Sequence, residues 1–414
     1  MNAGGNTDYI LKHKDSEVAV FTVDEDKNII KIINVSDKEL LPVGAKLRVS
    51  DESVAAALQK WIEERGIPES REDKEELRKL AGAKDSKDMM FGAYGLSLSD
   101  CYWMHKKEAQ GLQWKNVNFY ENAFADIMKN GKGKNKEEGE IERKVNPNLS
   151  VNGALTKKWF INKEGKRVLA KRGRSAQDQE PFNEEIAYKV AKMYGIECVK
   201  YRAAKDEEGK NVSACLCMFD GKEELMPASF VINEEERKGR NNYELYIDVC
   251  KNKGIKDIRE SVDKMIFLDY VLGNDDRHTH NFGIVRDAET LEWKKAVPLF
   301  DNGNILHYGA QEINDGMARE GVACRWFGGM KEEKLKHMEY PRWYKPGKDK
   351  EVCGIIRGVL SGNENIKEKK IKALEKIVSD RIRAFEREND IMLKVKELRM
   401  ESAGKEKKKK SRGR

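Results

Sequence analysis

The sequence lacks the features that mark disulfide-rich, secreted and membrane-spanning proteins. None of its seven cysteines forms a Cys-x-x-Cys pair and their number is odd, so we expect reduced thiols rather than a disulfide framework. No apolar run approaches the roughly eighteen residues that a membrane-spanning helix needs. The first residues, MNAGGNTDYILKHKD, contain no apolar core like that of a signal peptide. These absences favour a cytoplasmic protein without a membrane anchor.

The chain also carries little net charge outside its C-terminus. The net charge is +7, but the last ten residues, KEKKKKSRGR, hold seven basic residues and one Glu and therefore contribute +6. The other 404 residues sum to about +1, which does not indicate a nucleic-acid-binding body. We expect residues 401–414 to form a disordered basic tail that binds nucleic acid only weakly and in a salt-dependent way.

Histidine is scarce, with six residues in the whole chain. His278 and His280 form a His-x-His pair just after two adjacent aspartates, and such a set would suit zinc or a metal pair in a hydrolase. The other histidines show no ligand-like spacing; they are His13, His105, His307 and His337. A metal-dependent hydrolase is therefore an alternative. The simpler interpretation of His278 is a hydrogen-bonding residue that organises the loop beside Asp276.

The first third of the chain predicts a separate α/β region. At 414 residues the chain is long for one core, so more than one domain is expected. Within residues 1–128, two β-rich runs at 17–23 and 29–35 predict a hairpin. They precede an amphipathic helix that should end at Gly66. Residues 129–144 contain no aromatic and one aliphatic residue, which indicates a charged linker.

After the linker the pattern changes. KKWFINKEGKRVLAKRG predicts two strands around a turn, and PFNEEIAYKVAKMYG predicts a helix bounded by Pro181 and Gly195. Two further strands should follow. From residue 234 the pattern is mainly helical, with DIRESVDKMIFLDYVLG and a long C-terminal helix as its clearest parts. We therefore predict an α+β fold with a small β-rich lobe at 145–233 and a helical lobe at 234–400.

One stretch, GNDDRHTHNFGIV, concentrates polar side chains between apolar flanks. Its Asp276 and Asn281 are five residues apart, the spacing of the catalytic Asp and the metal-binding Asn of protein kinases. Asp301 follows about twenty residues later, after the strand-like VPLF. Carboxylate and amide oxygens suit magnesium, whereas histidines do not. With Lys171 at a strand end and Glu184 near a helix start, the order matches the parts that phosphoryl transfer from ATP needs.

These segments resemble the HipA-like serine/threonine kinase family. GNDDRHTHNFGIV followed by VPLFDNGN resembles its catalytic and metal-binding segments, written D-x-H-x-x-N and D-x-G. EPFNEEIAYKVAKMYGI resembles its N-lobe helix, and NLSVNGALTKKWFI its phosphate-binding loop, S-x-x-G-x-x-x-K. The resemblance covers roughly residues 145–385. It implies a two-lobed, protein-kinase-like fold, ATP and Mg²⁺ as cofactors, and a serine or threonine of a protein as the phosphate acceptor.

The resemblance also implies a role for each matching residue. Asp276 would be the catalytic carboxylate, and Asn281 and Asp301 would hold Mg²⁺. Lys171 would contact the nucleotide phosphates and pair with Glu184. The other residues expected to contact the nucleotide are the phosphate-loop residues Ser150, Val151, Asn152, Gly153 and Lys157, the hinge residues Cys217, Met218 and Phe219, and His278.

Regulation and the biological setting stay open at this point. Ser150 occupies the position that some family members autophosphorylate, which would repel ATP and eject the loop. Residues 1–128 do not clearly resemble the matching part of the toxin members, which pair with a DNA-binding antitoxin. Regulation by an antitoxin-like partner is therefore an open question. A second alternative is a pseudokinase scaffold or nucleic-acid-binding module, which the basic tail favours. Against it, every expected catalytic position is filled.

Overall fold

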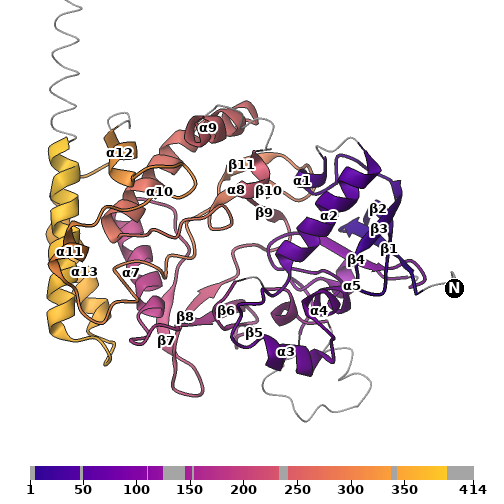
Figure 1. The fold of residues 1–414 in the computed structure, drawn as a ribbon, viewed down its shortest axis with the longest axis horizontal. Helices are drawn as coiled ribbons and strands as arrows, with labels where there is room; N and C mark the ends of the chain where they lie inside the picture. Colours follow the sequence, from indigo (N-terminus) through magenta and orange to yellow (C-terminus); the bar gives the residue numbers. More distant parts are fainter. Residues whose placement is uncertain are drawn as a thin grey trace, which may run out of the picture. The chain divides into compact units, whose positions relative to one another are not determined.

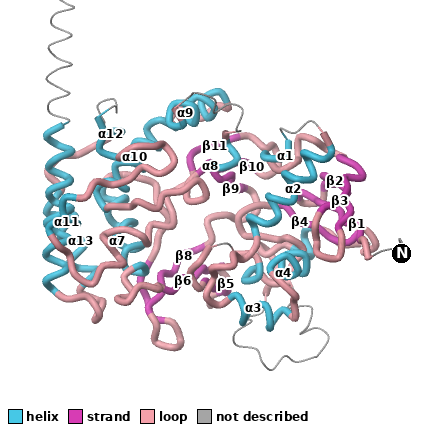
Figure 2. The backbone as a smooth tube through the Cα atoms, in the orientation of Figure 1, coloured by secondary structure: helices cyan, strands magenta, loops and turns pink. Residues whose placement is uncertain are grey.

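The computed structural model describes residues 5–46, 50–109, 111–124, 145–151, 153–232, 241–336 and 343–388 (Figure 1). Over these residues the fold is mixed α+β, and the strands form three antiparallel sheets (Figure 2). The predicted α+β class is confirmed. The predicted linker at 129–144 and basic tail at 401–414 lie outside the described residues.

The chain divides into two compact units, each assembled from three separate segments. The first unit contains Met1–Arg174, Lys200–Ile255 and Phe282–Val297. The second contains Ser175–Val199, Lys256–Asn281 and Pro298–Arg414. The domain boundaries expected from the sequence stay a prediction.

The first unit begins with a four-stranded sheet in the order β3-β2-β1-β4. The predicted hairpin is confirmed, because Phe21 lies opposite Ile32. Helix α2 packs along β3 and covers the sheet (Figure 1), and its Leu58 is fully buried. The elements are β1 (Thr7–His13), β2 (Ser16–Val23), β3 (Ile29–Val35), β4 (Tyr102–Lys106), α1 (Val43–Lys46) and α2 (Asp51–Arg65). Strands β1 and β4 were not predicted from the sequence.

Short helices continue the first unit. Helix α2 begins with a capping box formed by Ser50 and Ser53 and ends at Gly66, as expected. A small apolar cluster then forms around Leu77 and includes Leu149, which is 0% exposed. The helices are α3 (Lys74–Ala81), α4 (Ser86–Gly92), α5 (Trp114–Val117) and the 3₁₀ turn η1 (Pro147–Leu149). Because η1 leads into the predicted phosphate loop, the start of that loop is anchored in this cluster.

Two more sheets complete the first unit. One has the order β5-β6-β8-β7 and the other β11-β10-β9. The predicted pair of strands around the Asn-Lys-Glu-Gly turn is confirmed as β5 and β6. Strands β10 and β11 interrupt the mainly helical pattern expected after residue 234. The elements are β5 (Lys157–Ile161), β6 (Arg167–Arg172), β7 (Arg202–Lys205), β8 (Asn211–Leu216), β9 (Glu223–Pro227), α8 (Ala228–Val231), α9 (Asn242–Asn252), β10 (Gly283–Asp287) and β11 (Trp293–Ala296).

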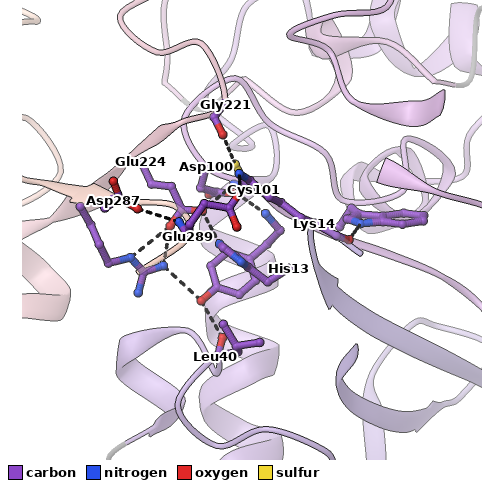
Figure 3. Close-up of polar contacts among 12 residues, drawn as sticks. His13, Lys14, Leu40, Asp100, Cys101, Gly221, Glu224, Asp287 and Glu289 are labelled. Carbon is purple, nitrogen blue, oxygen red and sulfur yellow. Dashed lines mark hydrogen bonds and ion pairs between the residues drawn. The ribbon is translucent and has the colours of Figure 1, made fainter. Parts of the chain in front are cut away.

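A buried polar network joins the N-terminal sheet to β9 and β10 (Figure 3). Glu224 on β9 is 1% exposed and accepts a hydrogen bond from the Cys101 N–H at 2.8 Å. Its carboxylate lies 2.6 Å from His13 Nε2 and also accepts from Arg286 at 3.0 Å. Burial raises the pKa of Glu224, but the contacts with His13 and Arg286 outweigh burial and lower it to about 2. The network fixes strands from the two ends of the first unit to each other.

The second unit is helical. Helix α10 is buried along most of its length, and it packs against α7 and α12 (Figure 1). The predicted end of α7 at Gly195 is confirmed, and Gly273 likewise stops α10 in the left-handed conformation. The helices are α7 (Glu180–Met193), α10 (Ile258–Leu272), α11 (Asp315–Arg319), α12 (Lys331–Lys336), α13 (Asp349–Leu360) and a helical segment at 368–388. Within the described residues, no helix is both long and apolar enough to span a membrane.

Candidate functional site

The predicted catalytic segment begins where α10 ends. Gly273 stops the helix with a φ of 73°, a conformation that glycine adopts without strain. The N–H of Asp276 then donates to the side-chain oxygen of Asn274 at 3.0 Å. The N–H of Asn281 donates to the carbonyl of His278 at 2.9 Å. These local bonds place Asp276 and Asn281 in one compact loop.

His278 organises this loop. Its Nδ1 accepts a hydrogen bond from the N–H of His280 at 3.3 Å, and its own N–H donates to the carbonyl of Asp276 at 2.8 Å. Burial lowers the pKa of His278, while the charges of Asp276 and Asp301 oppose that shift. Both predicted site carboxylates therefore lie within electrostatic reach of the ring. The loop-organising interpretation is confirmed, and a contact between His278 and the nucleotide stays a prediction.

A buried arginine joins the two predicted metal-binding segments, and the sequence analysis did not single it out. Arg277 is 5% exposed and pairs with the carboxylate of Asp269 in α10 at 2.8 Å. The same guanidinium donates to the carbonyl of Asn281 at 3.0 Å and to that of Phe300 at 2.7 Å. Since Phe300 immediately precedes Asp301, one side chain holds the segments of Asn281 and Asp301 together.

Helix α7 fixes the segment around Asp301 from another side. Asp301 has a φ of 57°, an uncommon conformation for a residue other than glycine. The N–H of the next residue, Asn302, donates to the carboxylate of Glu184 at 2.8 Å. The side-chain amide of Asn183, the residue preceding Glu184, donates to the carbonyl of Gly303 at 2.7 Å. Neighbouring polar residues of one buried helix thus hold the turn that presents Asp301.

The carboxylate of Asp276 has two partners of its own. Its Oδ2 accepts a hydrogen bond from the side-chain amide of Asn304 at 2.7 Å. Its Oδ1 lies 3.0 Å from the guanidinium of Arg325, whose side chain is 57% exposed. The Asp276 side chain is itself 31% exposed. It is therefore oriented by a neighbour and still accessible to a substrate.

A buried lysine holds the first residues of the same loop. Lys331 is 1% exposed, and its Nζ donates to the carbonyl of Asn274 at 2.5 Å and to that of Ala323 at 2.6 Å. Burial lowers the pKa of Lys331. This residue was not predicted from the sequence, because Lys331 opens an ordinary charged helix, KEEKLK. No local signal marks it as buried.

The predicted nucleotide residues belong to the first unit. Lys171 lies on β6, opposite Lys157 of β5 and Ser213 of β8. It is 4% exposed, and its ammonium lies 4.9 Å from the ring centre of Tyr201. A lysine held inside a sheet on an aromatic ring has few rotamers open to it, so its charge has a defined position.

The predicted phosphate loop is shaped by one glycine and one buried serine. Gly153 has a φ of 113°, and a Cβ there would lie 2.1 Å from the Nζ of Lys157. Only glycine fits this position, and it lets the lysine lie against the loop backbone. The hydroxyl of Ser150 donates to the carbonyl of Pro147 at 3.4 Å, and Ser150 is 6% exposed. Asn152 lies outside the described residues.

The predicted hinge follows β8. The N–H of Cys217 donates to the carbonyl of Arg167 at 2.8 Å, and burial raises the pKa of the Cys217 thiol to about 11. Met218 is 37% exposed and Phe219 is 8% exposed. An uncharged thiol and an exposed apolar side chain are compatible with an adenine surface, and that contact stays a prediction.

The predicted site residues are thus divided between the two units. The second unit brings together Asp276, Asn281 and Asp301, while Lys171 belongs to the first unit and Glu184 to the second. The pairing of Lys171 with Glu184 stays a prediction. For the hydrolase alternative, the described part of the chain holds no group of three or more His, Cys, Asp or Glu side chains placed to bind one metal ion.

Comparison with known families shows which protein family the chain belongs to. The family model described as the HipA-like C-terminal domain matches residues 148–361, half of the chain. The chain belongs to this family. The match covers the phosphate loop, the Asp276 loop and Asp301, which are the segments that carry the resemblance in the sequence.

Two solved structures are similar to the chain. One is the Helicobacter pylori proinflammatory kinase CtkA, with 16% identity, a TM-score of 0.45, and coverage of 57% of this chain and 96% of that chain. The other is HipA of Shewanella oneidensis, solved with HipB and its operator DNA, with 14% identity and a TM-score of 0.49. That similarity covers 92% of this chain and 99% of HipA. A search of the curated proteins found no match.

Proposed function

We propose that the protein is a kinase that transfers the γ-phosphoryl group of ATP, with Mg²⁺, to a serine or threonine of a protein substrate. The observation that carries the proposal is the buried guanidinium of Arg277. It binds backbone carbonyls of Asn281 and of Phe300, next to Asp301, and so fixes two oxygen-bearing side chains beside the Asp276 loop. Family membership supports the same activity.

The residues of the second unit fit a magnesium site. Asn281 offers an amide oxygen and Asp301 a carboxylate, and oxygen donors of this kind are those that Mg²⁺ prefers. When bound, Mg·ATP would supply the phosphoryl group and a positive charge against the negative charge that develops on it. Asp276 would orient the acceptor hydroxyl and take its proton, since its carboxylate is held by Asn304 and remains accessible.

The residues of the first unit fit the nucleotide. Lys171 would place its ammonium on the phosphates, and backbone N–H groups around Gly153 would face them. Residues 217–219 would meet the adenine. We also propose that Ser150 is an autophosphorylation site. Because the hydroxyl of Ser150 is buried, the loop would have to leave its present position before phosphate could be added, and a phosphoserine would not fit back.

The proposal also includes two kinds of partner protein, a substrate and a regulator. We expect a protein substrate, and we propose an antitoxin-like protein as a regulator to be tested by co-purification. The acceptor protein and the cytoplasm as the place of action remain part of this proposal. A pseudokinase scaffold is the competing function, and it would bind nucleotide or a partner without transferring phosphate.

The test compares aspartates that stand close together in the sequence. Asp276→Asn should lower phosphoryl transfer by about 10²–10⁴-fold, the usual contribution of a positioned base. Asp301→Asn should weaken Mg·ATP binding. Asp275→Asn is the matched control, since Asp275 is exposed and has no role in the proposal. The assay measures ADP formation and phosphate incorporation with and without Mg²⁺. Equal rates in wild type and Asp276→Asn would refute the assignment.

A further inference from the structure

A second buried arginine lies in the region before the family match and contacts the phosphate loop. The Arg71 side chain is 0% exposed. Its Nη1 lies 3.2 Å from the carbonyl oxygen of Val151 and 3.4 Å from that of Gly153. Its Nη2 donates to the carbonyl of Lys157 at 2.9 Å. One guanidinium therefore spans both ends of the predicted phosphate loop, from a position about eighty residues earlier in the chain.

The surroundings of Arg71 hold it in this position. Asp73 accepts hydrogen bonds from two nitrogens of the Arg71 guanidinium, one of them at 3.4 Å. Asp73 stands at the N-cap of α3, yet its side chain makes no capping hydrogen bond there. A side-chain cap of this kind usually stabilises a helix. The carboxylate that would normally cap the helix is used to fix Arg71 instead.

The apolar cluster beneath the loop supports the same attachment. Leu149, one residue before Ser150, is 0% exposed and packs with Ile67 and Leu77 of the N-terminal region. The loop is thus tied to residues 67–81 by apolar packing before Ser150 and by Arg71 after it. The bond to Lys157 also reaches the first residue of β5, which lies opposite Lys171 of β6.

The hydrogen bonds to carbonyls have a consequence for the neighbouring amides. A trans peptide unit is planar, so its C=O and the following N–H point in opposite directions. With the carbonyl of Gly153 directed at Arg71, the N–H of Ala154 is directed away from Arg71. The left-handed φ of Gly153 allows this orientation. An amide held in this way is a fixed hydrogen-bond donor for an anion.

We propose that Arg71 is a positioning residue for the nucleotide phosphates. By holding the carbonyls of the phosphate loop, it fixes the backbone so that the Ala154 N–H faces the phosphates of ATP. The N-terminal region is therefore part of the nucleotide site rather than a separate accessory domain. The inference rests on the proposed kinase function. It assigns no chemistry to Arg71, which acts only through the loop.

A lysine cannot replace Arg71 in this role. The planar guanidinium offers five N–H donors in a fixed arrangement, enough for three carbonyls and a carboxylate. The ammonium of lysine is compact and offers three. Arg71→Lys should therefore behave more like Arg71→Met than like wild type, although it keeps the charge.

The test measures Mg·ATP binding and kinetics in matched arginine variants. Arg71→Met and Arg71→Lys should weaken Mg·ATP binding by about tenfold to a hundredfold, the range for losing charged hydrogen bonds. KM for ATP should rise, with a much smaller change in kcat. The control is Arg78→Met. Arg78 lies on α3, pairs with Glu75 and donates to carbonyls away from the loop, so its variant should bind as wild type does.

Hydrogen exchange gives a second readout that does not depend on nucleotide. In Arg71→Met the amides of residues 153–156 should exchange faster than in wild type, while those of β6 should not change. If Arg71→Met does not fold, Asp73→Asn provides the same comparison with Arg71 present but loosened. Wild-type affinity and unchanged loop exchange in the Arg71 and Asp73 variants would overturn the positioning role alone. An absence of Mg·ATP binding in wild type would overturn the kinase proposal, and the inference with it.

Discussion

In two loops of this protein, a buried arginine binds backbone carbonyls and pairs with an aspartate, but the two arginines lie in different parts of the chain. In the second unit, Arg277 donates to backbone carbonyls of the Asp276–Asp301 region and is neutralised by Asp269, which is 2% exposed. In the first unit, Arg71 donates to carbonyls of the phosphate loop and is neutralised by Asp73, which is 9% exposed. Arg277 belongs to the loop it organises, whereas Arg71 reaches its loop from a distant segment.

The comparison teaches where each loop obtains its rigidity. The Asp276 loop depends on a buried ion pair inside a helical core, so disrupting it should destabilise the unit itself. The phosphate loop depends on a pair whose carboxylate is more exposed than Asp269, so disrupting it should change ligand affinity more than folding. Variants of the buried and the exposed pairs test this difference.

Removing Arg277 should have the largest effect on stability. Arg277→Met leaves the Asp269 carboxylate buried without its cation, which typically lowers the free energy of unfolding by about 3–5 kcal/mol. Urea denaturation measures this loss. The double variant that adds Asp269→Asn should recover part of the stability, because it removes the unpaired charge. If Arg277→Met is no less stable than Arg71→Met, the contrast between the two arginines is wrong.

The pH dependence of the free energy of unfolding should report on a third buried charged group, the carboxylate of Glu224, which contacts His13 and Arg286. The folded protein holds the pKa of Glu224 at about 2, below its usual value of 4.5, so the unfolded chain takes up this proton first as the pH falls. The stabilisation is complete above about pH 5 and is lost between about pH 5 and 2, and amounts to about 3 kcal/mol.

Glu224→Gln provides the comparison for that measurement. The variant should be less stable at pH 7, and its stability should fall less steeply than that of wild type between pH 5 and 2. Parallel pH curves for the two proteins would show that Glu224 is not held ionised by its neighbours.

Removing Arg325 should have the smallest effect. The Arg325 side chain, which pairs with Asp276, is 57% exposed. Exposed ion pairs of this kind contribute about 0–1 kcal/mol to the free energy of unfolding. Arg325→Met should therefore leave the urea midpoint almost unchanged. A loss as large as that of Arg277→Met would mean that Arg325, rather than Arg277, organises the loop.

Much of the architecture could be predicted from local sequence patterns. Hydrophobic periodicity and terminal glycines located α2, α7 and α10, and short β-rich runs located β2, β3, β5 and β6. Strand β4 pairs with β1 although about ninety residues separate them, and a local pattern carries no information about such a partner. The strand expected at VPLF is limited to a single bridge between Leu299 and Cys198, because the chain turns at once toward Asp301.

The candidate site could likewise be predicted only where its residues lie close together in the sequence. The spacing of Asp276 and Asn281 could be seen in the sequence because chemistry fixes it within one loop. Arg277 stands between them and has a readable signal, since Asp269 in an apolar helix needs a cationic partner. Arg71 and Lys331 have no such signal. They become buried only when distant segments pack around them, and each resembles an ordinary surface residue in its local sequence.

The most direct test of the central claim is the intact mass, with peptide mapping, of wild type, Asp276→Asn and Asp275→Asn before and after incubation with Mg·ATP. The account predicts added phosphate in wild type and Asp275→Asn and none in Asp276→Asn, with Ser150 as the expected position. Equal phosphate on Asp276→Asn and wild type, or none on either beside normal Mg·ATP binding, would contradict an active kinase that uses Asp276.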